Sequence, residues 1–254
     1  MISINNKSKI IDINNISLFY QTKETEVEAI RNISFSVSGG EFVGIVGPSG
    51  CGKSTLLSLI AGLLRPSSGS ITIYGKNTVG YMLQKDYLFP WRTIHQNILL
   101  GLEIKKAKTK ENIEKAENLL KTYGLWDFRN SFPDEISGGM RQRCALIRTL
   151  AVDPSILLLD EAFSALDYQT RLAVADDIYS IIKREKKTVL MVTHDISEAL
   201  SLCDRIIVLS SRPAVIKSEY NIDFGEELTP IDKRDRTEFP HYFNSIWRDI
   251  DVKV

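Results

Sequence analysis

The sequence lacks the features that mark several specialised classes of protein. Its three cysteines (Cys51, Cys144 and Cys203) are scattered and form no CxxC pair, which excludes a disulfide-stapled scaffold and indicates reduced thiols in a cytosolic protein. The chain carries no net charge, because 32 Lys and Arg balance 32 Asp and Glu. No global basic field is therefore available to hold nucleic acid or an acidic membrane surface, and we expect no nucleic-acid partner.

Long hydrophobic runs are also missing. The longest, residues 156–159 and 189–192, are the size of a strand and far below the roughly 20 residues of a membrane-spanning helix. Residues 1–7 contain no apolar core of the kind found in a signal peptide. We therefore expect a chain that is soluble by itself and that reaches a membrane only through a partner.

What is present is an ordinary globular composition. The 254 residues are 43% hydrophobic and 25% charged, which excludes disorder and collagen-like repeats. The length suits one domain with an insertion, or two small lobes, and allows a substantial core.

Periodicity predicts an α/β architecture. After residue 139, helical segments alternate with apolar segments, and strands that are apolar on both faces are typical of a mostly parallel sheet covered by helices on both sides. The predicted strands are residues 9–20, 33–37, 41–46, 71–74, 81–83, 156–159, 188–192 and 205–209. The predicted helices are residues 53–64, 108–123, 140–151, 168–183 and 196–203.

The stretch before this alternation has a helical character. Thr93 and Gln96 form a capping-box signature, and the predicted helix 108–123 has one apolar face. The chain therefore divides into three predicted parts. These are a core of residues 1–84 and 140–220, a helical subdomain of residues 85–139, and a short tail of residues 221–254 that is polar and shows no clear period.

A glycine-rich loop after the predicted strand 41–46 fits the pattern GxxxxGK[ST]. Because it follows a strand and opens a helix, its backbone N–H groups can converge on phosphate oxygens at the positive end of the helix. Lys53 supplies a cation to the β- and γ-phosphates, and the Ser54 hydroxyl can bind Mg²⁺. The sequence therefore predicts a nucleoside triphosphate site. Its residues are Gly47, Pro48, Ser49, Gly50, Cys51, Gly52, Lys53, Ser54 and Thr55.

Two acidic residues follow the apolar run 156–159. Asp160 comes where a strand ends, so its carboxylate can reach Mg²⁺ directly or through water, and Glu161 is placed to polarise an attacking water. A buried strand can also end in two acids without any catalytic role, so this pair alone does not assign a function.

A Ser-Gly-Gly turn connects the chain with a known family. Residues 136–142 read ISGGMRQ, and Ser137 lies 23 residues before Asp160. The segment resembles the signature loop of ABC-type ATPases, in which a hydroxyl and bare N–H groups meet an anion at the start of a helix. The resemblance implies nucleotide contacts for Ser137, Gly138 and Gly139. Two residues common in the signature are replaced, Leu by Ile136 and Gln by Met140.

Further positions match motifs of the same family in order and spacing. Gln84 matches the Q-loop, Asp167 ends a segment similar to the D-loop, and His194 matches the switch histidine. Tyr20 matches the aromatic residue that stacks on adenine. The adjacent Phe19 is an alternative, and a role in the core is also open for either ring.

The resemblance covers residues 9–220 and implies both a fold and its ligands. The implied fold is a P-loop NTPase (RecA-like) core with a mostly parallel sheet, an N-terminal antiparallel β subdomain and an inserted helical subdomain. The implied ligands are ATP and Mg²⁺, with the metal held by Ser54, Gln84 and Asp160.

The same resemblance implies a mechanism shared between two subunits. Glu161 acts as general base, Gln84 is counted among the catalytic residues, and His194 and Lys53 stabilise charge in the transition state. In this family the signature loop of one subunit completes the γ-phosphate shell on the Lys53 position of another. The implied active state is therefore a head-to-tail homodimer or pseudo-dimer that holds two ATP molecules.

Two segments indicate a branch of the family. Residues 86–93, just after the Q-loop, resemble a run found in the ATPases of nitrate, sulfonate, taurine and related importers, where it shapes the groove for the permease's coupling helix. The alternative is that Phe89 and Trp91 only pack the helical lobe. The short tail resembles that of the same importers, and we expect Phe243 and Trp247 to cover the sheet or a neighbouring protein.

The implied function is an ATP-hydrolysing subunit on the cytoplasmic face of the membrane, bound to integral-membrane permease subunits and served by an extracytoplasmic solute-binding protein. Nitrate, sulfonates, taurine and vitamin precursors all remain open as the solute. A DNA-repair ATPase of the superfamily would need a long coiled-coil or zinc insertion, and a P-loop kinase or GTPase would lack the Ser-Gly-Gly loop. A catalytically dead binding subunit would have lost Glu161 or His194, and both are present.

Overall fold

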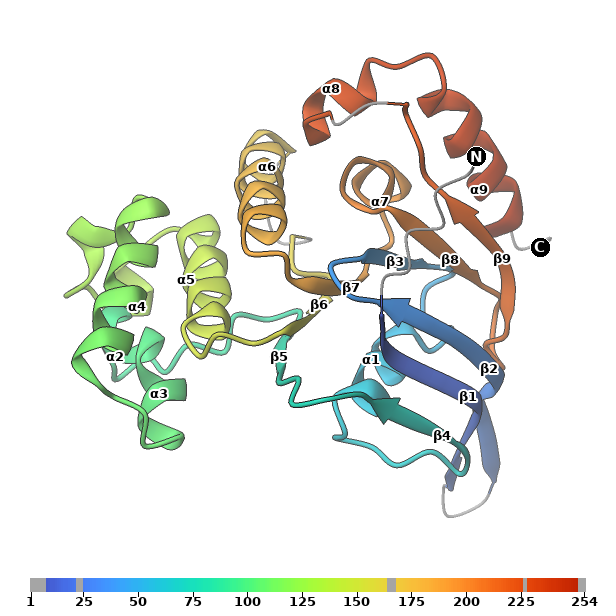
Figure 1. The fold of residues 1–254 in the computed structure, drawn as a ribbon, viewed down its shortest axis with the longest axis horizontal. Helices are drawn as coiled ribbons and strands as arrows, with labels where there is room; N and C mark the ends of the chain where they lie inside the picture. Colours follow the sequence, from blue (N-terminus) through green and yellow to red (C-terminus); the bar gives the residue numbers. More distant parts are fainter. Residues whose placement is uncertain (1–7, 22–24, 164–167, 226–227, 251–254) are drawn as a thin grey trace.

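The chain folds into two β-sheets with covering helices and a group of helices set to one side (Figure 1). The computed structural model describes residues 8–21, 25–163, 168–225 and 228–250. The predicted D-loop position Asp167 lies outside the described residues. Within the described ranges, no helix combines the length and the hydrophobicity needed to cross a membrane.

The first sheet is antiparallel and has the strand order β2-β1-β4. Its strands are β1 (Lys9–Gln21), β2 (Glu26–Ser38) and β4 (Ser68–Ile73). The strand predicted at 33–37 therefore begins earlier in the chain. One face of this sheet is apolar and packs, together with α1 (Lys53–Ile60), against the second sheet.

The second sheet has six strands in the order β5-β6-β7-β3-β8-β9. The first five pair in parallel, as predicted, and β9 joins the edge antiparallel to β8. The strands are β3 (Phe42–Val46), β5 (Val79–Met82), β6 (Ile156–Asp160), β7 (Thr188–Val192), β8 (Arg205–Leu209) and β9 (Ile216–Asn221).

Both faces of this parallel sheet are buried, which explains why its central strands are apolar without interruption. Successive residues of a strand point to opposite faces, and in β6 Ile156 and Leu158 join the core shared with the antiparallel sheet, whereas Leu157 and Leu159 join the core on the other side. That second core is covered by α6 (Tyr168–Arg184), α7 (Ile196–Leu202) and the helical group. The carboxyl ends of β3, β6 and β7 meet at one edge.

The helical group lies to the left in Figure 1 and is connected to the sheet through α5. Its members are α2 (Ile94–Ile98), α3 (Leu100–Ile104), α4 (Lys110–Thr122) and α5 (Gly138–Leu150), with single 3-10 turns at Trp126–Phe128 and Pro133–Glu135. The capping box predicted at Thr93 and Gln96 is confirmed at the start of α2. Helix α5 packs against α2, α3, α4 and β5, so it belongs to both parts of the chain.

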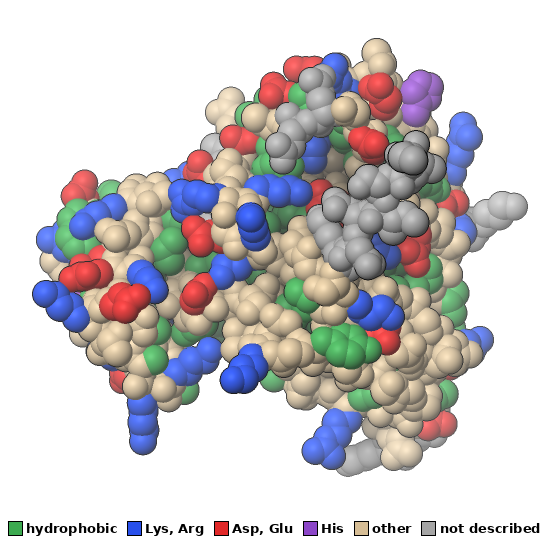
Figure 2. All heavy atoms as spheres, in the orientation of Figure 1, with side chains coloured by type: hydrophobic (Ala, Val, Ile, Leu, Met, Phe, Trp, Pro, Cys, Tyr) green, Lys and Arg blue, Asp and Glu red, His purple; other side chains and the backbone are tan. Residues whose placement is uncertain are grey.

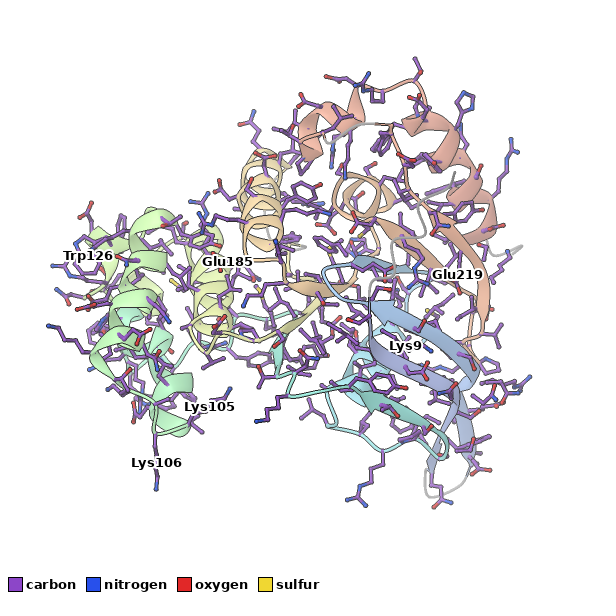
Figure 3. The ribbon with its side chains drawn as sticks, viewed as in Figure 1. Lys9, Lys105, Lys106, Trp126, Glu185 and Glu219 are labelled. Atoms are coloured by element: carbon purple, nitrogen blue, oxygen red, sulfur yellow. The ribbon has the colours of Figure 1, made fainter. Side chains whose placement is uncertain are left out.

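The surface of the helical group is polar and mixed in charge. Lysines, arginines, aspartates and glutamates are interspersed over the face seen in Figure 2. Trp126 lies on the side of the group away from the sheets, whereas Lys105 and Lys106 project from its lower end (Figure 3).

The tail is more ordered than the sequence analysis predicted. It forms α8 (Pro230–Arg234) and α9 (Phe239–Ile250), and α9 packs against α7 and β8. The expectation of no clear period is therefore wrong, because Phe239, Phe243 and Ile246 recur at helical spacing and face the core. Phe243 covers the core as expected, whereas Trp247 is 56% exposed and stacks on the outside of Phe243.

Candidate nucleotide-binding site

The glycine-rich loop joins β3 to α1 at the carboxyl edge of the parallel sheet, as its sequence context predicted. Gly52 has φ 126° at the start of α1, a conformation that residues with a Cβ rarely adopt. A Cβ on Gly47 would lie 2.8 Å from the Leu209 carbonyl oxygen of the neighbouring strand. Glycine is therefore required at both positions for the loop to turn this tightly.

Lys53 is held inside the loop that it follows. The side chain is only 5% exposed. Its ammonium donates hydrogen bonds to the carbonyl oxygens of Gly47 and Pro48, at 2.9 and 3.0 Å. These bonds fix the cation at the mouth of the loop, where it can exchange backbone carbonyls for phosphate oxygens.

A cavity of about 200 Å³ opens beside the loop. Its lining includes Glu161 and Arg212 besides residues of the loop itself. The predicted position Cys51 is not among the lining residues; its side chain is buried, and burial raises the pKa of the thiol despite the nearby Lys53 ammonium. The loop residues that line the cavity are Ser49, Gly50, Gly52, Lys53, Ser54 and Thr55.

Asp160 ends β6 next to the loop. Its carboxylate accepts a hydrogen bond from the Ser54 hydroxyl at 2.9 Å and another from the Tyr81 hydroxyl at 3.2 Å. Burial raises the pKa of Asp160, and the two hydrogen bonds partly offset that rise. Burial also raises the pKa of Tyr81 to about 12, so this phenol stays a donor. The sequence analysis missed Tyr81, whose only signal was its place on a strand beside β6.

Glu161 lies between Gln84 and His194, two of the three other predicted catalytic residues. Its carboxylate accepts a hydrogen bond from Gln84 Nε2 at 2.9 Å and lies 3.4 Å from His194 Nδ1. The backbone of Glu161 has φ 46°, in the left-handed region that costs a non-glycine residue energy, and its N–H bonds to the Val192 carbonyl of β7. The strand end thus holds the carboxylate at the cavity against a local conformational preference.

Of the aromatic pair on β1, Tyr20 contacts the helix that follows the loop. The Tyr20 hydroxyl lies 3.4 Å from Thr55 Oγ1 at the start of α1. Phe19 instead bonds through its backbone N–H to the Ser67 hydroxyl. Both rings are about two-fifths exposed, at 41% and 38%, so neither is a core residue.

The Ser-Gly-Gly turn lies elsewhere in the chain. Ser137 caps α5 by accepting a hydrogen bond from the Met140 N–H, and Gly138 and Gly139 form the first turn of that helix. In the part of the chain that the structure describes, none of these three residues lines the cavity beside the glycine-rich loop. The chain brings together the loop, Asp160, Glu161, Gln84 and His194, but it leaves the turn apart.

Comparison with known proteins gives a consistent result. The sequence model of the ABC transporter family matches residues 30–164. The chain is 43% identical over 249 residues to the ABC transporter ATP-binding protein YtlC of Bacillus subtilis, covering 94% of this chain and 95% of that protein. It is 42% identical over 227 residues to the nitrate import ATP-binding protein NrtD of Synechocystis, covering 87% and 85% of the two chains.

Other matches extend this result to sulfonate import and to solved structures. The aliphatic sulfonates import protein SsuB of Bacillus thuringiensis is 39% identical, with 86% of this chain and 89% of that protein covered. The dimeric ABC transporter cassette MJ0796 superimposes with a TM-score of 0.75 at 32% identity, over 84% of this chain and 99% of that one. The fold and the motifs together place the chain in the family of ABC transporter ATP-binding proteins.

Proposed function

We propose that this chain hydrolyses ATP to power a membrane importer of a small solute. The observation that carries the proposal is the position of Glu161 at the cavity, between Gln84 and His194. A carboxylate there can take a proton from a water that attacks the γ-phosphate, while the two neighbours orient the carboxylate and the water. Lys53 offsets the charge that develops on the transferred group.

The residues around Ser54 suit Mg²⁺. This cation prefers oxygen ligands and usually binds through one or two protein groups together with substrate phosphates. The Ser54 hydroxyl and the Asp160 carboxylate are in contact at 2.9 Å, within reach of the cavity. We propose that Ser54, Asp160 and Gln84 would hold the metal, which would supply positive charge to offset the negative charge of the phosphates.

The proposed active unit is a head-to-tail dimer. Ser137, Gly138 and Gly139 start a helix and so present N–H groups suited to an anion, yet in the described chain they do not reach the cavity. A second subunit would supply this turn to the first. The similarity to a dimeric ABC cassette supports this arrangement.

The aromatic segment after Gln84 is proposed to receive the permease. Trp91 is 70% exposed and Tyr87 58% exposed, so both side chains are accessible to a partner, and the Trp91 ring stacks on the Phe89 ring. The segment is nevertheless fixed, because the Arg148 guanidinium of α5 donates to the Asp86 and Tyr87 carbonyls at 2.6 and 2.8 Å. Helix α5 begins with the Ser-Gly-Gly turn, so a force on the segment would reach the turn through this helix.

The similarity to NrtD and SsuB supports nitrate, a sulfonate or a related solute as the cargo, with taurine and vitamin precursors as alternatives. The proposed location is the cytoplasmic face of the membrane, where permease subunits hold the chain. An extracytoplasmic binding protein would deliver the solute to them.

Uptake measurements in a strain lacking the gene test this proposal. The strain would receive nitrate as sole nitrogen, taurine or a sulfonate as sole sulfur, or a thiamine precursor. We expect the loss of one uptake, restored by the intact gene and by the surface control Lys105→Ala, but not by Lys53→Ala. Unchanged uptake of each of these solutes, with purified protein that still hydrolyses ATP, would contradict this group of solutes as the cargo and leave the ATPase.

A further inference from the structure

Arg212 approaches the glycine-rich loop from a segment that no motif analysis assigned to the site. It lies between β8 and β9, and its Nη2 donates a hydrogen bond to the Gly50 carbonyl oxygen at 2.9 Å. The side chain also lines the cavity that contains Lys53 and Ser54. A second cation thus reaches the edge of the proposed phosphate site.

The segment that carries Arg212 is held on both sides. The Ala214 N–H donates to the Ala29 carbonyl at 3.0 Å, and the Arg31 N–H donates to the Ala214 carbonyl at 2.9 Å, so the segment is bound to β2. The Val215 N–H donates to the Ser210 hydroxyl at 3.0 Å and closes the turn at its base. Ala214 is fully buried. The backbone of Arg212 is therefore fixed before any ligand binds.

The charge of Arg212 is available to an anionic ligand. Among the residues that the structure describes, no carboxylate lies within 4.0 Å of its guanidinium, whereas Arg205 of β8 pairs with Glu41 and with Glu219. Its field reaches the loop, because Lys53 and then Arg212 oppose the rise in the Cys51 pKa that burial causes. A cation at a cavity edge without a carboxylate partner favours a polyanion in that cavity.

We propose that Arg212 is a positioning residue of the nucleotide site. It holds the glycine-rich loop through the Gly50 carbonyl and adds positive charge opposite the phosphate chain. The proposal rests on the proposed ATPase function. It predicts that the contribution of Arg212 grows with the number of phosphates on the nucleotide, which a purely structural contact would not do.

The test is equilibrium binding of ATP, ADP and AMP, with Mg²⁺, to the full chain and to three variants. Arg212→Gln removes the charge, Arg212→Lys keeps it, and Arg65→Gln removes the same charge from an exposed position after α1. We expect Arg212→Gln to weaken ATP binding about tenfold, the size expected for a charge-assisted hydrogen bond. ADP should lose less, AMP should stay within about twofold, and Arg65→Gln should match the wild type.

The conservative variant separates charge from shape. Arg212→Lys should keep ATP affinity within about threefold of wild type, and KM for ATP in Arg212→Gln should rise more than kcat falls. An ATP affinity of Arg212→Gln within twofold of Arg65→Gln would overturn the proposal. So would an equal loss for all three nucleotides, or a tenfold loss in a folded Arg212→Lys.

The outcome for the wild type distinguishes the two proposals. A wild-type chain that binds no ATP would overturn the proposed function itself. If the wild type binds ATP and Arg212→Gln binds it equally tightly, only the role of Arg212 is overturned. If Arg212→Gln does not fold, as judged by its thermal unfolding, the Arg212→Lys result decides.

Discussion

The chain contains two helix starts built from the same local chemistry, glycines and a hydroxyl before a helix, and they differ in what surrounds them. The loop before α1 lies at the edge of the parallel sheet, where Asp160 of β6 bonds to Ser54 and Glu161 lines the same cavity. The turn before α5 caps its own helix through Ser137. Among the described residues, no carboxylate is hydrogen-bonded to the Ser137 hydroxyl. A helix start alone therefore does not make the proposed catalytic site, which also needs the acidic residues at the strand ends beside the loop.

The two regions are nevertheless connected. Gln142 of α5 donates a hydrogen bond to the Gln84 carbonyl at 3.3 Å, while the Gln84 side chain donates to Glu161. Arg141 of the same helix pairs with Asp86 at 3.2 Å. Movement of the turn relative to the sheet would thus act on the residue that holds the proposed base.

The largest expected effect comes from replacing Glu161, the proposed general base beside the glycine-rich loop. Glu161→Gln keeps the shape of the side chain and removes its ability to accept a proton, so hydrolysis should fall by about a hundredfold or more while ATP binding persists. Phosphate release and nucleotide binding measure the two properties separately, with Glu185→Gln at an exposed position just after α6 as control (Figure 3). Turnover that stays within twofold of wild type would remove Glu161 from the mechanism.

Mixing two inactive variants would test whether the Ser-Gly-Gly turn of one subunit completes the nucleotide site of another. Lys53→Ala disables the loop, and Ser137→Glu places a repelling charge at the turn. In a head-to-tail dimer of one chain of each kind, one of the two sites combines an intact loop with an intact turn. An equal mixture should therefore recover up to about a quarter of wild-type hydrolysis, since half of the dimers are mixed. A mixture no more active than either variant would argue against a shared site.

A smaller effect concerns Glu198 in α7, the helix that follows His194. Glu198 in α7 is 5% exposed, and burial raises its pKa to about 7 from an ordinary 4.5. Between these values the folded chain holds a proton that the unfolded chain releases, so the stability it contributes is present at low pH and is lost as pH rises through 7. Raising the pH from 5.5 to 8 should cost the wild type about 2 kcal/mol more than it costs Glu198→Gln.

Urea unfolding of both proteins at these two pH values measures that difference. The Gln side chain has the same size and cannot ionise, so it serves as the matched control. Equal losses in the two proteins would show that Glu198 ionises normally in the folded chain.

The smallest expected effect tests whether Trp91, in the aromatic segment after Gln84, is a docking residue or packs the helical group. Trp91 is exposed, so Trp91→Ala should change the free energy of unfolding by less than about 0.5 kcal/mol. Leu88, three residues earlier, is only 8% exposed, and Leu88→Ala should cost about 2 kcal/mol or more. Denaturant unfolding of the pair provides the comparison. A large loss in Trp91→Ala would favour the packing role for that ring.

Sequence reasoning was strongest where a motif and its local structure coincide. The parallel strands, the capping box at Thr93 and the glycine-rich loop follow from periodicity and from residue types within a few positions, and the structure has all of them. It failed at α9, where the apolar residues of the helix already show the period. Pro240 interrupts the pattern when it is read as a helix breaker, although proline is tolerated in a first helical turn.

The order of motifs along the chain, together with the residue types that bind phosphate, is enough to indicate the family and to predict the candidate site. The tertiary structure alone decided which residues meet. It brought the Tyr20 hydroxyl to Thr55 and Tyr81 to Asp160, and it brought Arg212 to Gly50 from a segment 162 residues further along the chain. The physical reason is that spacing along a chain encodes local hydrogen bonding and burial, whereas contacts between distant segments depend on how whole strands are ordered in the sheet.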